Sequence, residues 1–188
     1  LHDAFVAALL GGLRRYHALH GVEIDDIAAS MAVTLNRADD PMGGGKMAGA
    51  MVALPVDIVE PDDRIAAVRG EVFAVRTEPA LRSLRRLAPL ANRLPAAVSA
   101  LAVELAPSAD IAISTIPGVP YPVYMAGAQV ERLYPFGPLP GVAVMAALVS
   151  HNGVACIGLN VDGTAVPDID ALASCMAEGL EEVIGLVG

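Results

Sequence analysis

The elements that the sequence predicts occur in the order of an α/β fold, in which a mixed β-sheet is packed with helices mainly on one face. Amphipathic helical segments open and close the chain, and apolar segments of strand length lie between them. A proline-rich stretch interrupts the strands of the second half, where a His-Asn-Gly turn joins two long apolar strands. Strands and helices do not alternate one by one, which argues against a Rossmann domain. We therefore interpret residues 1–188 as a single domain.

Four elements are expected before residue 78. Their ranges are Asp3 to about His20 for a helix, 28–35 and 47–55 for two strands, and a second helix that Pro61 opens. Apolar residues at helical spacing support the first helix, and Gly21 is suited to end it. Proline is favoured at the first position of a helix, where its missing N–H costs nothing. The buried face of the second helix is expected to carry Ile65, Val68, Val72 and Val75.

The middle of the chain is expected to be helical over 80–94 and 96–105. Pro89 should kink the first of these helices, because proline removes a backbone donor. One side of that helix carries leucines, and the other side carries Arg82, Arg85, Arg86 and Arg93. Such a basic face fits a solvated surface, a membrane interface or the entry path of the phosphates of coenzyme A.

Strands dominate after residue 109. The predicted ranges are 111–114, 141–150 and 154–161, with a short strand near Tyr124 inside the irregular stretch 117–140. Asp168 or Asp170 is expected to cap a last helix, since an aspartate side chain accepts hydrogen bonds from the free N–H groups of the first turn. The apolar stripe of this helix is expected to comprise Ile169, Leu172, Met176, Leu180, Val183 and Ile184.

Composition argues against several classes of protein. The formal net charge of −9 disfavours nucleic acid as a partner, because phosphate contacts need a basic surface. No run reaches the roughly 18 apolar residues of a membrane span. Cys156 and Cys175 have no metal-site spacing, and we expect two buried free thiols rather than a disulfide. No basic segment precedes the first apolar run, so a reducing, cytoplasmic location is expected.

Eight short motifs follow one another in a characteristic order. They are Asp3–Val6, Gly45 with Met51–Asp57, Glu60–Arg64, Ser114–Gly118, Tyr124–Ala128, Leu133–Pro135, Ser150–Gly153 and Val166–Asp168. No single motif is specific, but the ordered set covers nearly the whole chain. It resembles the C-terminal half of the bacterial wax ester synthase/diacylglycerol acyltransferase family.

The resemblance implies half of a two-domain fold like that of the coenzyme A-dependent acyltransferases, with an active-site tunnel between the halves. It also implies transfer of a fatty acyl group from acyl-CoA, as substrate, to the hydroxyl of diacylglycerol or of a fatty alcohol, with no bound cofactor. The family's base is a histidine of an HHxxxDG motif in the N-terminal half, and no HHxxxDG occurs in these 188 residues. The partner is therefore an N-terminal acyltransferase half. The opening at Leu1, within a helical pattern, fits a segment of a longer polypeptide.

The chain departs from the family at four positions. His2 and Lys46 stand where the family usually has asparagine, and so does Thr115, before the Pro-Gly turn. His151 stands where the family often has tyrosine. An asparagine side chain both donates and accepts hydrogen bonds, so the three lost carboxamides point to altered site geometry, with a different acceptor or reduced activity.

Four residues are candidates for substrate binding on this resemblance, namely Thr115, Ser150, Asn152 and Asp3. Each has an alternative structural interpretation that stays open. Thr115 ends a strand and Asp3 suits the start of a helix, while Ser150 and Asn152 are ordinary turn residues. Pro117 and Gly118 are interpreted as architectural, because they turn the chain sharply.

Other polar residues are interpreted as structural. His17 and His20 lack further metal ligands and are expected to face solvent, and His151 has no nucleophile or carboxylate beside it in sequence. The glycines at 43–45 lie between strands, which does not fit a phosphate loop. Two alternatives to an enzyme half remain: a non-catalytic module that binds acyl chains or acyl-CoA, and a homodimerisation module. For an enzyme with lipid acceptors, attachment to a membrane or lipid-droplet surface is also expected.

Overall fold

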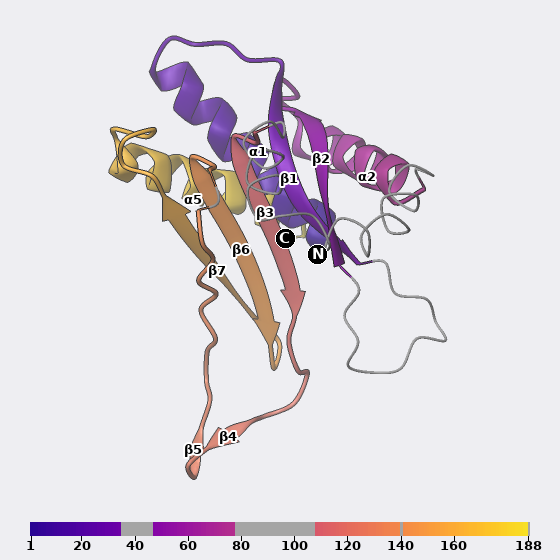
Figure 1. The fold of residues 1–188 in the computed structure, drawn as a ribbon, viewed down its shortest axis with the longest axis vertical. Helices are drawn as coiled ribbons and strands as arrows, with labels where there is room; N and C mark the ends of the chain where they lie inside the picture. The colour runs from indigo at the N-terminus through magenta and orange to yellow at the C-terminus, as the bar shows by residue number, and fades with distance from the viewer. Residues whose placement is uncertain (35–46, 78–107, 140, 188) are drawn as a thin grey trace, which may run out of the picture.

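The described residues form a five-stranded sheet with three helices packed on one face, as Figure 1 shows for α1 and α5 behind the sheet. The computed structural model describes residues 1–34, 47–77, 108–139 and 141–187. The helices are α1 (His2–Leu19), α2 (Pro61–Thr77) and α5 (Ile169–Ile184), followed by the 3-10 turn η1 (Gly185–Val187). The strands are β1 (Asp26–Thr34), β2 (Met47–Pro55), β3 (Ile111–Pro117), β4 (Tyr124–Met125), β5 (Ala128–Gln129), β6 (Val144–His151) and β7 (Val154–Val161).

The main sheet is mixed. Its spatial order is β2-β1-β3-β6-β7, with parallel pairing of β1 to β3 and of β3 to β6. The outer strands β2 and β7 are antiparallel to their neighbours β1 and β6. The two-residue turn between β6 and β7 allows only antiparallel pairing. Alternate residues therefore face the helices, among them Ile111 and Ile113 on β3 and Val144 and Leu148 on β6.

The core lies between this sheet face and the helices. Every residue from Phe5 to Leu13 of α1 is buried, so α1 is covered on all sides along this stretch. Val68 and Val72 of α2 are buried with it, and Ile65 and Val75 pack at the margin, as the sequence predicts. α1 packs mainly against α5, and glycines allow this close approach. A Cβ on Gly12 would lie 2.8 Å from Cα of Met176, and a Cβ on Gly179 would lie 2.7 Å from the backbone nitrogen of Gly12.

A buried arginine connects the three helices. Arg64 of α2 is fully buried; its Nε donates to the carbonyl of Ala7 at 2.7 Å. Its Nη1 donates to the carbonyls of Ile58 and Val59, each at 3.0 Å, and its Nη2 donates to Glu182 of α5 at 2.6 Å. These contacts satisfy the charge and most donors of a side chain that is costly to bury unpaired.

Glu182 makes a second ion pair, with Arg15 of α1 at 3.1 Å. Partial burial by itself raises the pKa of Glu182, but the hydrogen bonds and charges of Arg15 and Arg64 outweigh it and lower the pKa below its ordinary value of 4.5. The unfolded chain therefore binds a proton to Glu182 more readily than the folded chain. The resulting stabilisation is present above about pH 4.5 and is lost as the pH falls through the folded-state pKa.

We expect Glu182→Gln to flatten the acid limb of the stability curve. The amide carries no titrating proton, so its unfolding free energy should fall less steeply than that of the wild type between about pH 5 and 3. Urea unfolding at a series of pH values measures this effect. Glu178→Gln is the control: Glu178 also pairs with Arg15, at 3.4 Å, but its side chain is 61% exposed, so that the pair is screened by solvent and weak. Parallel wild-type and Glu182→Gln curves would contradict the expectation.

An extended arm leaves the sheet after β3. We define the arm as residues 118–139, which run past the end of the sheet to the β4–β5 hairpin and return to β6, as Figure 1 shows. Ala126 and Gly127 form the hairpin tip, both with positive φ. The returning leg packs on the sheet face opposite the helices: Pro135 is buried there, and the carbonyl of Gly137 accepts a hydrogen bond from Nδ2 of Asn160.

The predicted α/β class, with helices mainly on one face, is confirmed. β2 and β7 have the predicted bounds, and the ends of β1 and β6 differ from the predicted ones by one to three residues. β4 lies at the short strand predicted near Tyr124, and β3 runs on to Pro117 rather than ending at Ser114. The stripe predicted for the last helix is wrong at its ends, since Ile169 and Ile184 are exposed. Asp168 is the cap, and its Oδ1 accepts from the backbone N–H of Ala171 at 3.0 Å.

Several further expectations can be placed. Cys156 and Cys175 are free and buried, as expected. The helices predicted over 80–94 and 96–105, with Pro89 and the basic face, lie outside the described residues, as do the glycine loop at 43–45 and Lys46.

Candidate functional site

The carboxyl ends of β1, β3 and β6 meet at one edge of the sheet, because these neighbouring strands run parallel. Ligands of open α/β sheets typically bind outside the carboxyl ends of the strands. Ser150 on β6 pairs in register with Pro117, two residues beyond Thr115 on β3, so both side chains lie on the helix-covered face. We call this region the carboxyl edge.

The first turn of α1 also lies at the carboxyl edge. His2 Nδ1 is 2.8 Å from Oγ1 of Thr115, which ties the start of α1 to the end of β3. Both residues are half-buried. His2 and Thr115 are two of the positions at which the sequence departs from the family that it resembles. The structure therefore joins two departures that lie 113 residues apart in the chain.

Asp3, the neighbour of His2, forms an ion pair with Arg69 of α2, with Nε and Oδ2 3.1 Å apart. The Arg69 side chain is 71% exposed, so this pair is solvent-screened and weak. Asp3 also suits the positive end of the α1 dipole. The predicted substrate-binding role of Asp3 therefore stays a prediction beside two structural roles.

Pro117 and Gly118 turn the chain from β3 into the arm beside Ser150. The backbone N–H of Gly118 points to Oγ of Ser150 at 3.4 Å, a long hydrogen bond. A Cβ on Gly118 would overlap the carbonyl oxygen of Ser150, so only glycine fits here. This contact gives a physical reason for the architectural role predicted for the turn.

The β6–β7 turn holds both legs of the arm. The backbone N–H of Asn152 donates to the carbonyl of Val119 on the outgoing leg at 3.0 Å. His151 Nε2 lies 3.2 Å from the carbonyl of Val130 on the returning leg. His151 is 2% exposed, and its Nδ1 has no partner among the described residues. Asn152 adopts φ 46°, and its exposed position fits a turn residue better than a ligand-holding one.

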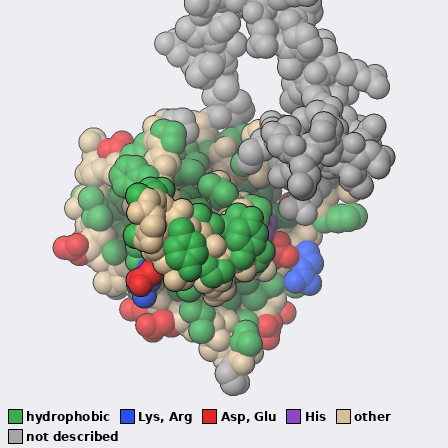
Figure 2. Space-filling model, turned by 90° about the horizontal axis from the view of Figure 1, so that it is seen from below, with side chains coloured by type: hydrophobic (Ala, Val, Ile, Leu, Met, Phe, Trp, Pro, Cys, Tyr) green, Lys and Arg blue, Asp and Glu red, His purple; other side chains and the backbone are tan. Residues whose placement is uncertain are grey.

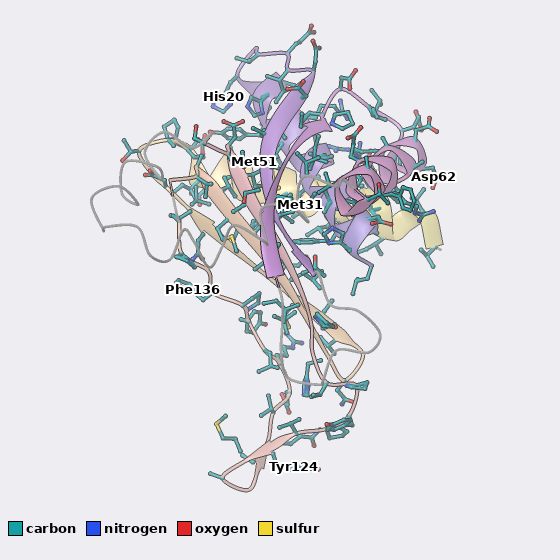
Figure 3. All side chains as sticks on the ribbon, turned by 45° about the vertical axis from the view of Figure 1, so that its right-hand side comes forward. His20, Met31, Met51, Asp62, Tyr124 and Phe136 are labelled. Carbon is teal, nitrogen blue, oxygen red and sulfur yellow. The ribbon has the colours of Figure 1, made fainter. Side chains whose placement is uncertain are left out.

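The arm presents a large apolar surface. Its exposed hydrophobic side chains are Tyr121, Tyr124, Met125, Leu133, Tyr134, Phe136 and Leu139. Figure 2, which views the molecule from the end that carries the arm, shows hydrophobic side chains over the middle of this face and charged ones mainly at its rim. Figure 3 places Tyr124 at the far end of the arm and Phe136, 93% exposed, projecting from the returning leg. Exposed apolar patches of this kind mark interaction surfaces.

The carboxyl edge offers groups that can bind and orient a polar substrate, namely two hydroxyls and one imidazole. The other described histidines are engaged elsewhere: His17 and His20 bond to carbonyls within α1, at 2.8 and 2.9 Å. Burial raises the pKa of the Cys175 thiol, which keeps it protonated and a poor nucleophile. Within the described residues, no cluster of three metal-ligating side chains occurs, and no helix is long and apolar enough to cross a membrane.

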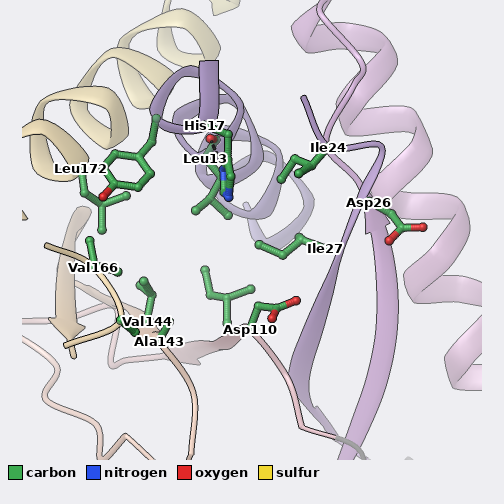
Figure 4. Close-up of a pocket in the computed structure, with 13 residues that line it drawn as sticks. Leu13, His17, Ile24, Asp26, Ile27, Asp110, Ala143, Val144, Val166 and Leu172 are labelled. Carbon is green, nitrogen blue, oxygen red and sulfur yellow. Dashed lines mark hydrogen bonds between the residues drawn. The ribbon is translucent and has the colours of Figure 1, made fainter. Parts of the chain in front are cut away.

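A separate cavity lies at the opposite end of the parallel strands. It has a volume of about 330 Å³ and is lined by the first residues of β1, β3 and β6 and by α1 (Figure 4). Leu13, Ile27 and Val144 form part of its apolar wall, and Asp26 and Asp110 lie at its rim. His17 also lines this cavity and is half-buried, so the expectation that it faces solvent is wrong.

The sequence predicts Thr115 and Ser150 as candidate site residues but does not predict their surroundings. His2 was noted as a departure and not as a partner of Thr115, because nothing in the sequence indicates a contact across so many residues. The buried position of His151 was also missed. The only signal was its place in a turn between two apolar strands.

Comparison with known proteins assigns the chain to a family. Residues 43–183 match the family model of the WS/DGAT C-terminal domain. A Mycobacterium tuberculosis protein that carries the provisional name diacylglycerol O-acyltransferase is 34% identical over 188 residues, which are 100% of this chain and 38% of that protein. A second such protein of the same organism is 24% identical over 200 aligned positions, which cover 100% of this chain and 40% of that protein. The chain thus spans about two fifths of the length of these relatives.

Solved structures show the same fold. The wax ester synthase/diacylglycerol acyltransferase from Marinobacter aquaeolei VT8 aligns with a TM-score of 0.66 at 22% identity, over 96% of this chain and 42% of that chain. A variant of the starter condensation domain of rhizomide synthetase aligns with a TM-score of 0.60 at 13% identity, over 97% and 41% of the two chains. At these identities the likeness concerns the fold, whereas the family model matches three quarters of the sequence directly. The chain belongs to the WS/DGAT C-terminal domain family.

Proposed function

We propose that this chain is the C-terminal part of a lipid O-acyltransferase that moves a fatty acyl group from acyl-CoA to the hydroxyl of diacylglycerol or a fatty alcohol. The observation that carries the proposal is the match over 43–183 to a family named for these two activities. The relatives named as diacylglycerol O-acyltransferases support it, since they align with the whole of this chain.

The reaction assigns different tasks to the two parts of the protein. The acceptor hydroxyl oxygen attacks the thioester carbonyl carbon, the C–S bond breaks, and coenzyme A leaves as a thiol. The proton that the hydroxyl loses must be taken by a base. We assign the base to a segment outside these 188 residues and assign binding and orientation of substrate groups to the carboxyl edge, with Thr115 and Ser150 as the contributing hydroxyls.

The partner in this proposal is the remaining acyltransferase segment of the same polypeptide. The apolar arm supports it, because nothing among the described residues covers the side chains from Tyr121 to Leu139 that are exposed there. Burial of such a surface against a second domain would be strongly favourable. Because the proposed acceptors are membrane lipids, we further propose a cytoplasmic protein that works at the surface of membranes or lipid droplets.

Product analysis of the full polypeptide tests the proposed function. Radiolabelled acyl-CoA is supplied with diacylglycerol or with a long-chain alcohol, and the lipids are separated by thin-layer chromatography. We expect label in triacylglycerol or wax ester. If acyl-CoA binds but no ester forms with either acceptor, the proposal is wrong and the non-catalytic binding module replaces it.

The arm gives a prediction of its own. In the full polypeptide, Phe136→Ser should lower acyl transfer by roughly 10-fold or more, because a large aromatic anchor is lost from the interface between the parts. The matched control is Phe73→Ser on α2, whose side chain is 68% exposed and lies outside the arm; it should change activity less than about 2-fold. Equal effects of the two substitutions would contradict an interface role for the arm.

The alternative partner of the arm is a second copy of this chain, which would form a homodimer through the same surface. Sedimentation of the full polypeptide distinguishes the two. We expect a monomer whose mass does not change with concentration, whereas a dimer that the Phe136→Ser substitution dissociates would support self-association instead.

A further inference from the structure

We infer that His2 is a positioning residue for acyl transfer: through its 2.8 Å contact it sets the direction of the Thr115 hydroxyl, which orients the acceptor alcohol. The inference rests on the proposed function and adds to it a pair of residues with distinct roles. Thr115 touches the substrate, and His2 acts only through Thr115.

The contact is built from two fixed elements. Thr115 lies on a central strand that is paired on both sides in the sheet, by β1 near its start and by β6 along its whole length. His2 begins an 18-residue helix that is buried from Phe5 to Leu13. The two side chains therefore meet with little freedom to move apart. Both are half-buried and not fully enclosed, so a substrate group can reach them from outside the sheet edge.

Whether Nδ1 of His2 carries a proton decides whether the Thr115 hydroxyl presents an acceptor or a donor to the substrate. When Nδ1 carries no proton, it accepts the hydrogen of Thr115, and the lone pairs of Oγ1 remain to accept a hydrogen bond from the acceptor alcohol. That bond aims the alcohol oxygen at the thioester carbon. When Nδ1 carries a proton, it donates to Oγ1, and the hydroxyl hydrogen turns outward. The alcohol then meets a donor in place of an acceptor and is held in the wrong orientation.

Among the described residues, Asp3 on α1 and Arg69 on α2 are charged neighbours of the pair, and they are paired with each other at 3.1 Å. β3 carries no ionisable side chain. β6 contributes the uncharged Ser150 at this edge and ends at His151, which the alternation of the strand places on the opposite face of the sheet. The α-amino group of Leu1 precedes His2 in the isolated chain, and in a longer polypeptide it would be an uncharged amide. Within the described part of the chain, His2 is the ionisable side chain in hydrogen-bond contact with Thr115.

The test uses the full polypeptide and initial rates with acceptor and acyl-CoA varied separately. His2→Ala should lower kcat/KM for the acceptor by roughly 10- to 100-fold and leave KM for acyl-CoA unchanged. Thr115→Val should do the same, and the double variant should be no worse than either single variant, because the residues act as a unit. Thr115→Ser keeps the hydroxyl and should retain most activity.

The pH profile separates positioning from a merely structural contact. Asparagine can place its Oδ1, which only accepts, near the position of histidine Nδ1, so His2→Asn keeps an acceptor for the hydrogen of Thr115 without a titrating proton. Wild-type kcat/KM should fall on the acid side of the histidine range, between about pH 8 and 5, and His2→Asn should lose that limb. Melting temperatures of the wild type, His2→Asn and Thr115→Ser should agree within a few degrees.

The outcomes are distinct. A wild-type polypeptide with no transferase activity overturns the proposed function and this inference with it. An active wild type in which His2→Ala keeps its acceptor kcat/KM, or in which His2→Asn keeps the acid limb, overturns the inference and leaves the proposed function standing. A third outcome also overturns the inference: the variants lose activity in proportion to their loss of melting temperature, and the kinetic parameters for acceptor and acyl-CoA change together. His2 would then have a structural role only.

Discussion

Gly179→Ala should lower the free energy of unfolding by about 3 kcal/mol. The added methyl group would meet the carbonyl oxygen of Ala8 and the backbone nitrogen of Gly12, both on α1. These are backbone atoms in the middle of a buried helix, and they cannot rotate away as a side chain would. The helices α1 and α5 must separate, and the contacts of neighbouring core residues weaken with them.

The control is Gly70→Ala. Gly70 lies inside α2, and nothing lies within 4 Å of the place where its Cβ would be. Alanine favours a helix over glycine by about 1 kcal/mol, so this variant should be slightly more stable than the wild type. Urea unfolding followed by circular dichroism measures both. Equal stability of Gly179→Ala and the wild type would mean that α1 and α5 do not pack as closely as described.

Arg64→Met should destabilise the fold by about 3–5 kcal/mol, the range seen when one partner of a buried ion pair is removed. Methionine has a similar length and fills much of the same space, so the loss is mainly electrostatic. The carbonyls of Ala7, Ile58 and Val59 lose their donor, and Glu182 keeps only Arg15 as a partner.

Arg69→Met is the matched control, on the same helix and with the same replacement. The Arg69 side chain is 71% exposed and pairs only with Asp3 in the described structure, so the expected cost is at most about 1 kcal/mol. Urea unfolding of both variants gives the difference. A cost for Arg64→Met no larger than that for Arg69→Met would show that the buried network adds nothing to stability.

The fold could be predicted largely because hydrophobic periodicity is a local signal. α1 begins and ends within one residue of its predicted range, and the β6–β7 hairpin follows from its turn. The order of the strands could not be predicted in the same way. β1, β3 and β6 are parallel neighbours although long segments separate them in sequence. The exposed residues at the ends of α5 are mispredicted because periodicity along one helix does not show which of its residues other elements cover.

The site could be predicted only in part, and for a related reason. Thr115 and Ser150 were found from the resemblance of their motifs, each of which is local in sequence. The contact of Thr115 with His2 and the ties of the β6–β7 turn to Val119 and Val130 join distant segments. The polar network of Arg64 and Glu182 has the same character, since it depends on three helices meeting around one guanidinium.

The most direct test of the central claim compares the full polypeptide with residues 1–188 alone. Release of coenzyme A thiol from acyl-CoA is followed with and without diacylglycerol or a fatty alcohol. We expect acceptor-dependent release by the full polypeptide and none by residues 1–188. Equal acceptor-dependent release by the two proteins, or no release by the full polypeptide with either acceptor, would contradict it.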